Sequence, residues 1–170
     1  KLTTAAHLEG YYYKPRVDKD LLRAHADGLI ALSGCMAGEL ARTIQAGNTP
    51  KAEEVIREYQ SIFGKENYCI EIMHHPDVEH FAEWRAALIE LSRKLNIPLA
   101  GTQDSHYLHR DDARAHKTLI AISTQSDIGE TALFSGDGDY HFISTEEARE
   151  LFKAIPEAVT NTERIAEQCS

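Results

Sequence analysis

The sequence predicts an α/β fold in which parallel strands are flanked by helices. Three short apolar segments, residues 29–34, 67–73 and 97–103, have the length and composition of buried strands. A helical pattern follows each of them, and this alternation favours parallel pairing. Three strands are too few to close a barrel, and the first helix has no strand before it. We therefore expect the chain to be a segment of a longer protein.

The helices predicted before the second strand have recognisable ends. Residues 17–28 form the first, with Asp18 as its N-cap and Gly28 as its end. Residues 36–47 form the next, which ends at Gly47.

Two longer helical patterns surround the second strand. Residues 49–64 predict a helix with Thr49 as its N-cap, Pro50 in its first turn and Gly64 as its end. Residues 78–96 carry the clearest period, because large apolar residues recur there every three or four positions. These residues are Phe81, Trp84, Leu88, Leu91 and Leu95.

The C-terminal part is predicted as a helix, a loop, a short strand and two helices, at residues 111–123, 126–140, 140–144, 144–154 and 156–169. Ser144 and Glu147 have the spacing of a capping box. The loop contains glycines but lacks the pattern of a phosphate-binding loop.

Composition excludes several classes of protein. The 170 residues carry a net charge of −9, and 42% of them are hydrophobic, which is normal for a globular chain. The acidic balance argues against a broad basic face for duplex DNA. No apolar run reaches the roughly 18 residues of a membrane helix, and the first ten residues lack the apolar core of a signal peptide. We expect no membrane partner.

The cysteines argue for a reducing, cytoplasmic setting. The chain has three cysteines, Cys35, Cys69 and Cys169, and no Cys-x-x-Cys pair. The odd number argues against a disulfide framework, and the missing pair argues against a zinc ribbon.

Residues suited to metal binding follow all three predicted strands. The strands end in Ser-Gly-Cys at 33–35, Met-His-His at 73–75 and Thr-Gln-Asp-Ser-His at 102–106. Active sites of α/β sheets collect at the C-terminal ends of strands. Zn²⁺, Mn²⁺ and Fe²⁺ accept such mixtures of thiolate, imidazole and carboxylate. We expect Cys35, Asp104 and His106 to converge there.

Each of these residues also has a simpler interpretation. Asp104 and His106 are two apart, so they point the same way in extended backbone, yet Asp104 could cap the next helix while His106 is solvated. Cys35 could be a small core residue. His75 could line the same site or begin a turn.

Two further features stay open at this level. Glu71 lies inside an apolar strand, where a carboxylate must be paired or face an edge; it could support the fold or neighbour the site. Residues 11–13 are three tyrosines followed by Lys14 and Arg16. Such a cluster could stack bases and hold phosphates, or pack beneath the next helix.

Four strings together resemble one family. HLEGYYYKPRVDKDLL, GLIALSGCMAGEL, PLAGTQDSHYLHRDDARAHKTLIAI and PEAVTNTERIAEQC are similar, in this order, to bacterial DNA polymerase III alpha subunits, the C-family replicative polymerases. The resemblance falls in the C-terminal half of the N-terminal polymerase and histidinol phosphatase (PHP) domain. It implies that residues 1–125 are the second half of this domain and that residues 126–170 lead toward the polymerase body.

The resemblance also implies a fold and a metal site. The fold would be part of a distorted, TIM-like (β/α)7 barrel around divalent metal ions (Zn²⁺, Mn²⁺ or Mg²⁺). Cys35, Asp104 and His106 match ligand positions, whereas the family's early His-x-His motif would lie before Lys1, which leaves the site incomplete here. Gln103 stands where many relatives have Asn, and His75 stands where relatives often have another polar residue.

The implied activities belong to the parent protein. It would add deoxynucleotides to DNA with other replicase subunits, using catalytic residues that this segment lacks. Its PHP site would hydrolyse phosphodiesters as a 3′–5′ exonuclease or would support the polymerase structurally. The alternatives are a stand-alone metal-dependent phosphoesterase of the same superfamily and a non-catalytic scaffold or interaction module.

Overall fold

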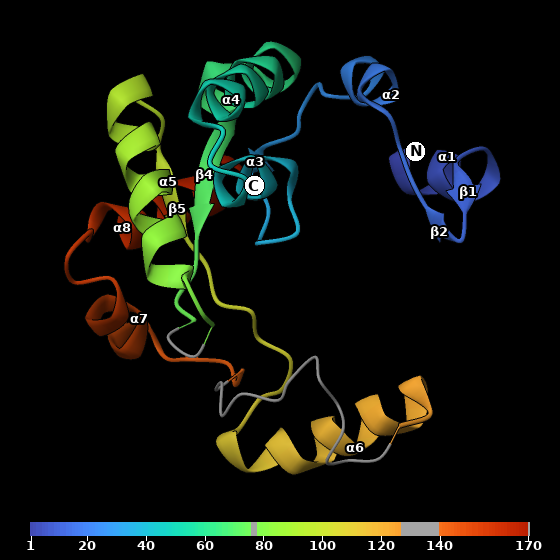
Figure 1. Ribbon diagram of the computed structural model, residues 1–170, viewed down its shortest axis with the longest axis vertical. Coiled ribbons are helices and arrows are strands. Elements are labelled where there is room, and N and C mark those ends of the chain that lie inside the picture. The colour runs from blue at the N-terminus through green and yellow to red at the C-terminus, as the bar shows by residue number, and fades with distance from the viewer. Residues whose placement is uncertain (76–77, 127–139, 170) are drawn as a thin grey trace. The chain divides into compact units, whose positions relative to one another are not determined.

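A computed structural model describes residues 1–75, 78–126 and 140–169 (Figure 1). The chain divides into two compact units, residues 1–70 with 91–98 and residues 71–90 with 99–170. In chain order, the elements are α1 (Leu2–Leu8), β1 (Tyr11–Tyr12), β2 (Lys14–Pro15), α2 (Lys19–Ala24), β3 (Ala31–Leu32), α3 (Glu39–Gln45), α4 (Thr49–Phe63), η1 (Lys65–Asn67), β4 (Tyr68–Ile72), α5 (Phe81–Leu95), β5 (Leu99–Gly101), η2 (Arg110–Asp112), α6 (Ala113–Thr124), α7 (Thr145–Leu151) and α8 (Glu157–Gln168).

The three predicted strands form one sheet in the order β3-β4-β5. β3 and β4 are parallel, with Ala31 opposite Tyr68. β5 also runs parallel to β4, because the Ile70 N–H donates to the Pro98 carbonyl and the Thr102 N–H donates to the Ile72 carbonyl further along both strands. The α/β prediction with parallel strands is therefore confirmed.

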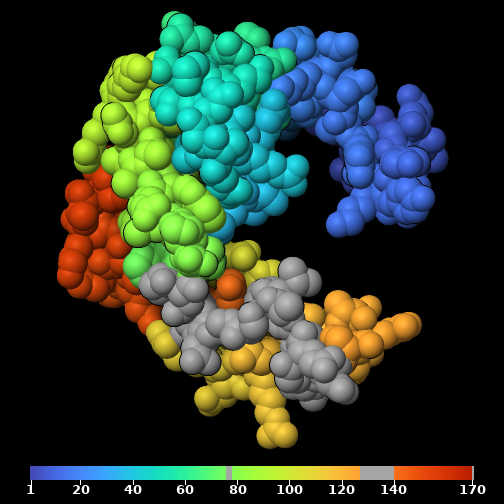
Figure 2. Space-filling model, viewed as in Figure 1, coloured from blue at the N-terminus to red at the C-terminus, as the bar shows by residue number. Residues whose placement is uncertain are grey.

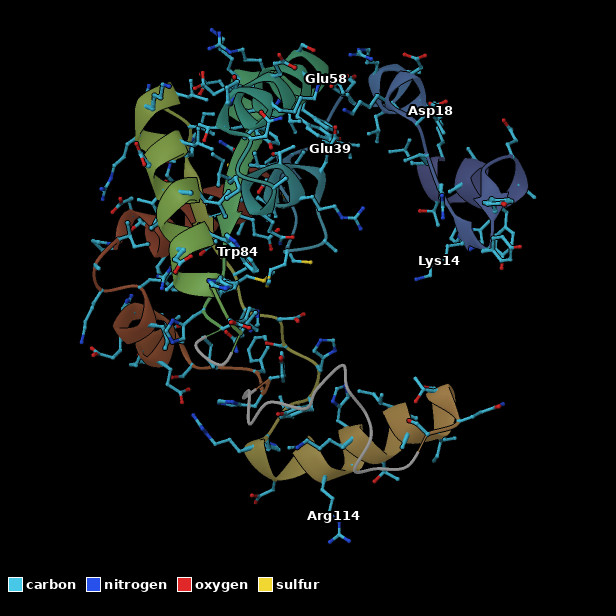
Figure 3. The ribbon with its side chains drawn as sticks, viewed as in Figure 1. Lys14, Asp18, Glu39, Glu58, Trp84 and Arg114 are labelled. Carbon is cyan, nitrogen blue, oxygen red and sulfur yellow. The ribbon has the colours of Figure 1, made fainter. Side chains whose placement is uncertain are left out.

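The N-terminal residues form an element that the sequence analysis did not anticipate. Helix α1 precedes an antiparallel hairpin of β1 and β2, in which Tyr11 lies opposite Pro15 and Tyr12 lies opposite Lys14. Figure 2 shows this segment in blue, and Figure 3 labels Lys14 on the hairpin. All three tyrosines are exposed. The alternative in which they pack beneath the next helix is therefore wrong.

Helices α3 and α4 pack against each other in the first unit. Buried side chains from both helices and from β4 form its core. They include Leu40, Val55, Ile56, Tyr68 and Ile70. The N-cap of α4 is Asn48, which accepts a hydrogen bond from the Lys51 N–H at 3.1 Å. The prediction of Thr49 was wrong by one residue, because the Asn48 side chain reaches the unpaired N–H groups first.

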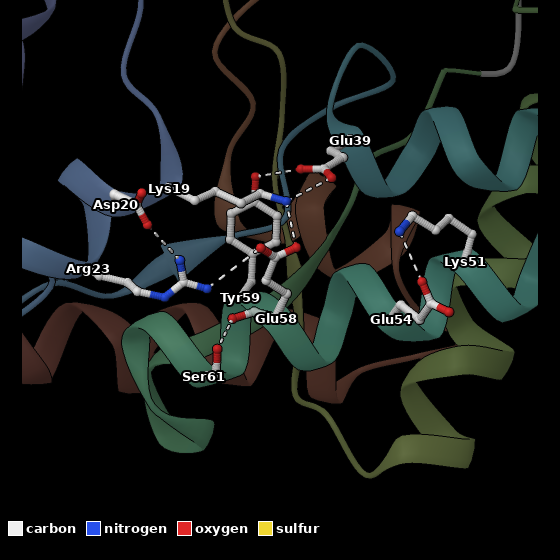
Figure 4. Close-up of polar contacts among 9 residues, drawn as sticks. All are labelled: Lys19, Asp20, Arg23, Glu39, Lys51, Glu54, Glu58, Tyr59 and Ser61. Carbon is white, nitrogen blue, oxygen red and sulfur yellow. Dashed lines mark hydrogen bonds and ion pairs between the residues drawn. The ribbon is translucent and has the colours of Figure 1, made fainter.

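An ion-pair network fastens α2 to α3 and α4 (Figure 4). Asp18 caps α2 as predicted, by accepting from the Leu21 N–H at 2.8 Å. Nζ of Lys19 then lies 2.9 Å from Glu39 and 2.7 Å from Glu58. Burial lowers the pKa of Lys19, but the hydrogen bonds to Glu58 and Glu39 outweigh it and leave the pKa raised.

Helix α8 packs along β5 in the second unit. The Asn161 side-chain amide donates to the Leu99 carbonyl at 2.8 Å. Leu99, Ala100 and Phe152 are buried there. The Phe152 ring lies close to Gly101, where an added Cβ would come within 3.3 Å of it.

The long helix α5 is confirmed, but its predicted apolar face is only partly buried. Leu91 is buried, whereas Phe81, Trp84, Leu88 and Leu95 are half-buried. No helix among the described residues is long and apolar enough to cross a membrane.

The C-terminal predictions have mixed outcomes. The capping box of Ser144 and Glu147 is confirmed at the start of α7. The possible strand at 140–144 is not one, because His141 forms an isolated bridge with Tyr107 and its neighbours join no ladder. Most of the predicted loop, residues 127–139, lies outside the described residues.

Candidate functional site

The candidate site begins where β5 ends. The Thr102 N–H extends the pairing to β4 by donating to the Ile72 carbonyl at 2.9 Å. The Thr102 hydroxyl donates to Glu71 at 2.6 Å. Glu71 is half-buried inside an apolar strand, where a carboxylate needs a hydrogen-bonding partner. The Thr102 hydroxyl provides one. Thr102 thus anchors the start of the segment that carries Asp104 and His106.

Asp104 and His106 face each other. Nε2 of His106 lies 3.1 Å from Oδ1 of Asp104. The His106 side chain is 36% exposed and the Asp104 side chain is 45% exposed, so both are accessible to solvent. The next helical turn, η2, is capped by His109, not by Asp104. A carboxylate and an imidazole this close are a donor pair that divalent transition metals accept.

Backbone hydrogen bonds hold the segment that carries this pair. The His106 N–H donates to the Tyr140 carbonyl at 2.8 Å, and the Phe142 N–H donates to the Tyr107 carbonyl at 2.9 Å. The Tyr107 hydroxyl accepts from the Tyr140 N–H at 3.0 Å. These contacts fix the backbone at His106 and Tyr107.

Rings from two other segments lie beside His106. Its ring centroid lies 5.0 Å from that of His116 and 5.6 Å from that of Tyr140. Tyr140 in turn lies 5.8 Å from His75, which also contacts Phe81 edge-on at 5.2 Å. His75 therefore lies one ring away from the Asp104–His106 pair.

His116 and Tyr140 were not among the predicted site residues. His116 lies on α6, and burial, followed by the nearby His106, lowers its pKa. It comes back toward His106 because the chain turns at η2, where the His109 N–H donates to Asp112 at 3.0 Å. The one signal available in the sequence was the short separation of His106 and His116, with Asp111 and Asp112 between them.

Cys35 lies in the first unit, in the loop between β3 and α3. Its side chain is exposed, which contradicts the alternative of a small core residue. The loop is tight, because the Gly38 N–H donates to the Cys35 carbonyl at 2.8 Å and a Cβ on Gly38 would lie 2.8 Å from the Ser33 carbonyl oxygen. The convergence of Cys35 with Asp104 and His106 stays a prediction. Among the described residues, no group of three or more His, Cys, Asp or Glu side chains is placed to hold a metal ion.

Comparison with known proteins bears on the resemblance. Residues 1–75 match the PHP domain family. The chain is also similar to DNA polymerase III subunit alpha of Treponema pallidum, with 40% identity over 99% of this chain and 14% of the relative. The corresponding protein of Borreliella burgdorferi is 38% identical over 99% of this chain and 15% of its own length. That of Thermus aquaticus is 37% identical over 99% of the chain and 14% of the relative.

The expected resemblance to the PHP region of DNA polymerase III alpha subunits is thereby confirmed. The chain spans about one seventh of the length of these relatives. The PHP match ends at residue 75, so the boundary predicted at residues 125 and 126 stays a prediction.

Proposed function

We propose that the chain is a segment of a bacterial replicative DNA polymerase and contributes Cys35, Asp104 and His106 to the metal site of its PHP domain. The observation that carries this proposal is the similarity of nearly the whole chain to DNA polymerase III alpha subunits. DNA, deoxynucleotides and other replicase subunits would then be partners of the parent protein in the cytoplasm. The residues that add nucleotides would lie outside this segment.

The Asp104–His106 pair fits a divalent metal ion. It joins a carboxylate oxygen to an imidazole nitrogen 3.1 Å away, and neither side chain is buried. Such a donor set suits Zn²⁺ or Mn²⁺. A bound divalent ion would lower the pKa of a water molecule and offset negative charge on a phosphodiester. This is how an acidic chain could take part in phosphate chemistry.

The roles of the neighbouring residues follow from their contacts. Thr102 holds the backbone before Asp104, and the Tyr140 carbonyl holds it at His106. His116 and Tyr140 limit the directions that the His106 ring can take. Glu71 is placed to support the strand end and, through Thr102, the segment that carries the ligands.

Metal titration of the 170-residue chain tests the ligand assignment. We expect weak binding of Mn²⁺ or Zn²⁺ by calorimetry, because two ligands alone do not fill a coordination sphere. Replacing a residue that only supports a metal ligand lowers metal affinity by about 10- to 100-fold. Asp104→Asn and His106→Gln, which replace the ligands themselves, should each lower the affinity at least ~10-fold. Cys35→Ser should weaken Zn²⁺ binding if the thiolate joins the same ion. His7→Gln, an exposed histidine in α1, is the control. Unchanged affinity in the first two variants would refute the assignment.

A nuclease assay tests the choice between a polymerase segment and a stand-alone enzyme. We expect the pure chain to release no nucleotides from DNA at appreciable rate with Mn²⁺ or Zn²⁺. Strong metal-dependent release that Asp104→Ala abolishes would contradict the segment proposal and favour an independent phosphoesterase.

A further inference from the structure

The hairpin of β1 and β2 presents an aromatic and basic surface that the proposed metal site does not use. Tyr11, Tyr12 and Tyr13 are 62%, 67% and 81% exposed. Lys14 and Arg16 are exposed beside them. Rings this exposed contribute little to folding, because apolar area stabilises a fold only when it is removed from water.

The hairpin is held in one shape. The Arg16 N–H donates to the Gly10 carbonyl at 3.1 Å, and an added Cβ on Gly10 would lie 2.0 Å from the Arg16 carbonyl oxygen. The turn residue, Tyr13, has a φ of 59°, a left-handed conformation that a tyrosine rarely adopts. Such conformations persist where the surrounding structure enforces them, and they often mark functional segments. The three rings are therefore displayed on a defined turn.

Aromatic rings and cations lie side by side on one face of this hairpin. Tyr12 is the cross-strand partner of Lys14. The Arg16 guanidinium lies 5.8 Å from the centre of the Tyr12 ring, close enough for a cation-π contact. The Tyr12 and Tyr13 rings meet edge-on at 4.7 Å.

The local charge differs in sign from that of the chain. Lys1, Lys14 and Arg16 outnumber the single acidic residue, Glu9, in the first seventeen positions, whereas the whole chain carries −9. The ligand must therefore bring both flat apolar faces and negative charge. Among macromolecules, an unpaired nucleic-acid strand offers both, because its bases stack on aromatic rings and its phosphates bind Lys and Arg.

We propose that the β1–β2 hairpin binds single-stranded DNA, with bases stacked on Tyr12 and Tyr13 and phosphates held by Lys14 and Arg16. The duplex is excluded as the main ligand because its bases are already stacked on one another and the surrounding chain repels its higher charge density. The choice of DNA over RNA rests on the proposed function, whereas the choice of a single strand rests on the hairpin alone.

Binding of fluorescein-labelled oligothymidylate to the 170-residue chain, followed by fluorescence anisotropy in EDTA, tests this proposal. EDTA removes metal ions, so failure of the metal-site assignment leaves the result unaffected. We expect Tyr12→Ala and Tyr13→Ala to weaken binding about 5- to 150-fold each, the range for losing one stacked base. Tyr12→Phe should retain binding, because it keeps the ring. Phe142→Ala is the matched control, since Phe142 is 68% exposed, as much as Tyr12.

The salt dependence tests the phosphate contacts. Lys14→Ala should reduce the slope of log affinity against log salt by about 0.7, the value for one phosphate of a single strand. Lys65→Ala, an exposed lysine outside the hairpin, should leave it unchanged. Circular dichroism of each variant shows whether it is folded, and photo-cross-linking of the unmodified chain, with the linked residues located by mass spectrometry, gives a measurement that needs no variant.

The outcomes are decisive. Cross-links at the hairpin tyrosines, with binding that both alanine variants weaken, would support the proposal. Three results would overturn it: no binding by the unmodified chain at low salt, alanine variants that both bind as tightly as the unmodified chain, or tighter binding of duplex DNA than of the single strand. Oligouridylate of the same length that binds as tightly as the DNA strand, or more tightly, would overturn the assignment to DNA.

Discussion

The Thr102 hydroxyl donates a hydrogen bond to the Glu71 carboxylate at 2.6 Å. This contact joins the end of β5 to the interior of β4, the neighbouring strand. It shows how an apolar strand accommodates a carboxylate, and it lies two residues before Asp104. The stability of this strand end and the position of the candidate ligands therefore depend on the same side chain.

Replacement of Thr102 tests the strength of this contact. Thr102→Val keeps the shape of the side chain but removes the donor. We therefore expect the free energy of unfolding to fall by about 1–3 kcal/mol, the cost of removing a hydrogen bond from a half-buried carboxylate. Thr102→Ser keeps the hydroxyl and should lose less. Urea denaturation of the two variants measures the difference. Equal losses would show that the hydroxyl is not what stabilises the strand end.

The amide of Asn161 is expected to fasten α8 to β5. It donates to the Leu99 carbonyl at 2.8 Å. Asn161→Ala should lower the free energy of unfolding by about 1 kcal/mol, the net value of one such hydrogen bond. Asn161→Asp should cost more, because a carboxylate oxygen would then face the carbonyl oxygen. Thermal denaturation compares these variants with Thr160→Ala, an exposed neighbour on the same helix; an aspartate variant as stable as the alanine variant would contradict this role.

The Lys19 network should make stability depend on pH. The hydrogen bond from Lys19 is the largest cause of the lowered pKa of Glu58. A carboxyl with a lowered folded pKa stabilises the fold above its unfolded pKa, about 4.3, and loses this contribution as the pH falls through the folded value. Lys19→Met should therefore cost about 1 kcal/mol at neutral pH and should flatten the loss of stability between about pH 5 and pH 3.

Urea denaturation at neutral and acidic pH measures both effects. Lys51→Met is the control, because Lys51 forms a more exposed ion pair with Glu54 within a single helix. An acid dependence that Lys19→Met leaves as steep as before would show that Glu58 does not gain its stability from Lys19.

The parts of the structure that the sequence predicted depend on local signals. Apolar runs identified β3, β4 and β5, and Asp18 and Ser144 identified helix starts, because a short side chain next to unpaired N–H groups acts within a few residues. Thr49 was predicted as the N-cap of α4 in place of Asn48, because both residue types cap helices and only the backbone conformation shows which one does.

The candidate site depended on contacts that are not local. Asp104 and His106 could be paired from their spacing, whereas the approach of His116 and Tyr140 to His106 depends on chain reversals that no periodicity reveals. The exposure of the three tyrosines was likewise undecided, because the same aromatic cluster suits a packed surface and a binding surface.

Gly101, the final residue of β5, lies directly against the Phe152 ring. A Cβ added there would lie 3.3 Å from three carbons of the Phe152 ring, which is 2% exposed and has little room to move. Gly101→Ala should therefore cost about 1–3 kcal/mol of stability, as overpacked cores do. Adding Phe152→Leu should recover part of this loss, because the smaller side chain makes room for the methyl group. The control is Gly47→Ala. Gly47 has a φ of +67°, and an added Cβ there would have no neighbour within 4 Å, so this substitution destabilises only through the backbone conformation. Phe152→Leu should therefore not relieve it. Purely additive effects of Gly101→Ala and Phe152→Leu in thermal denaturation would contradict direct packing between this strand end and the ring.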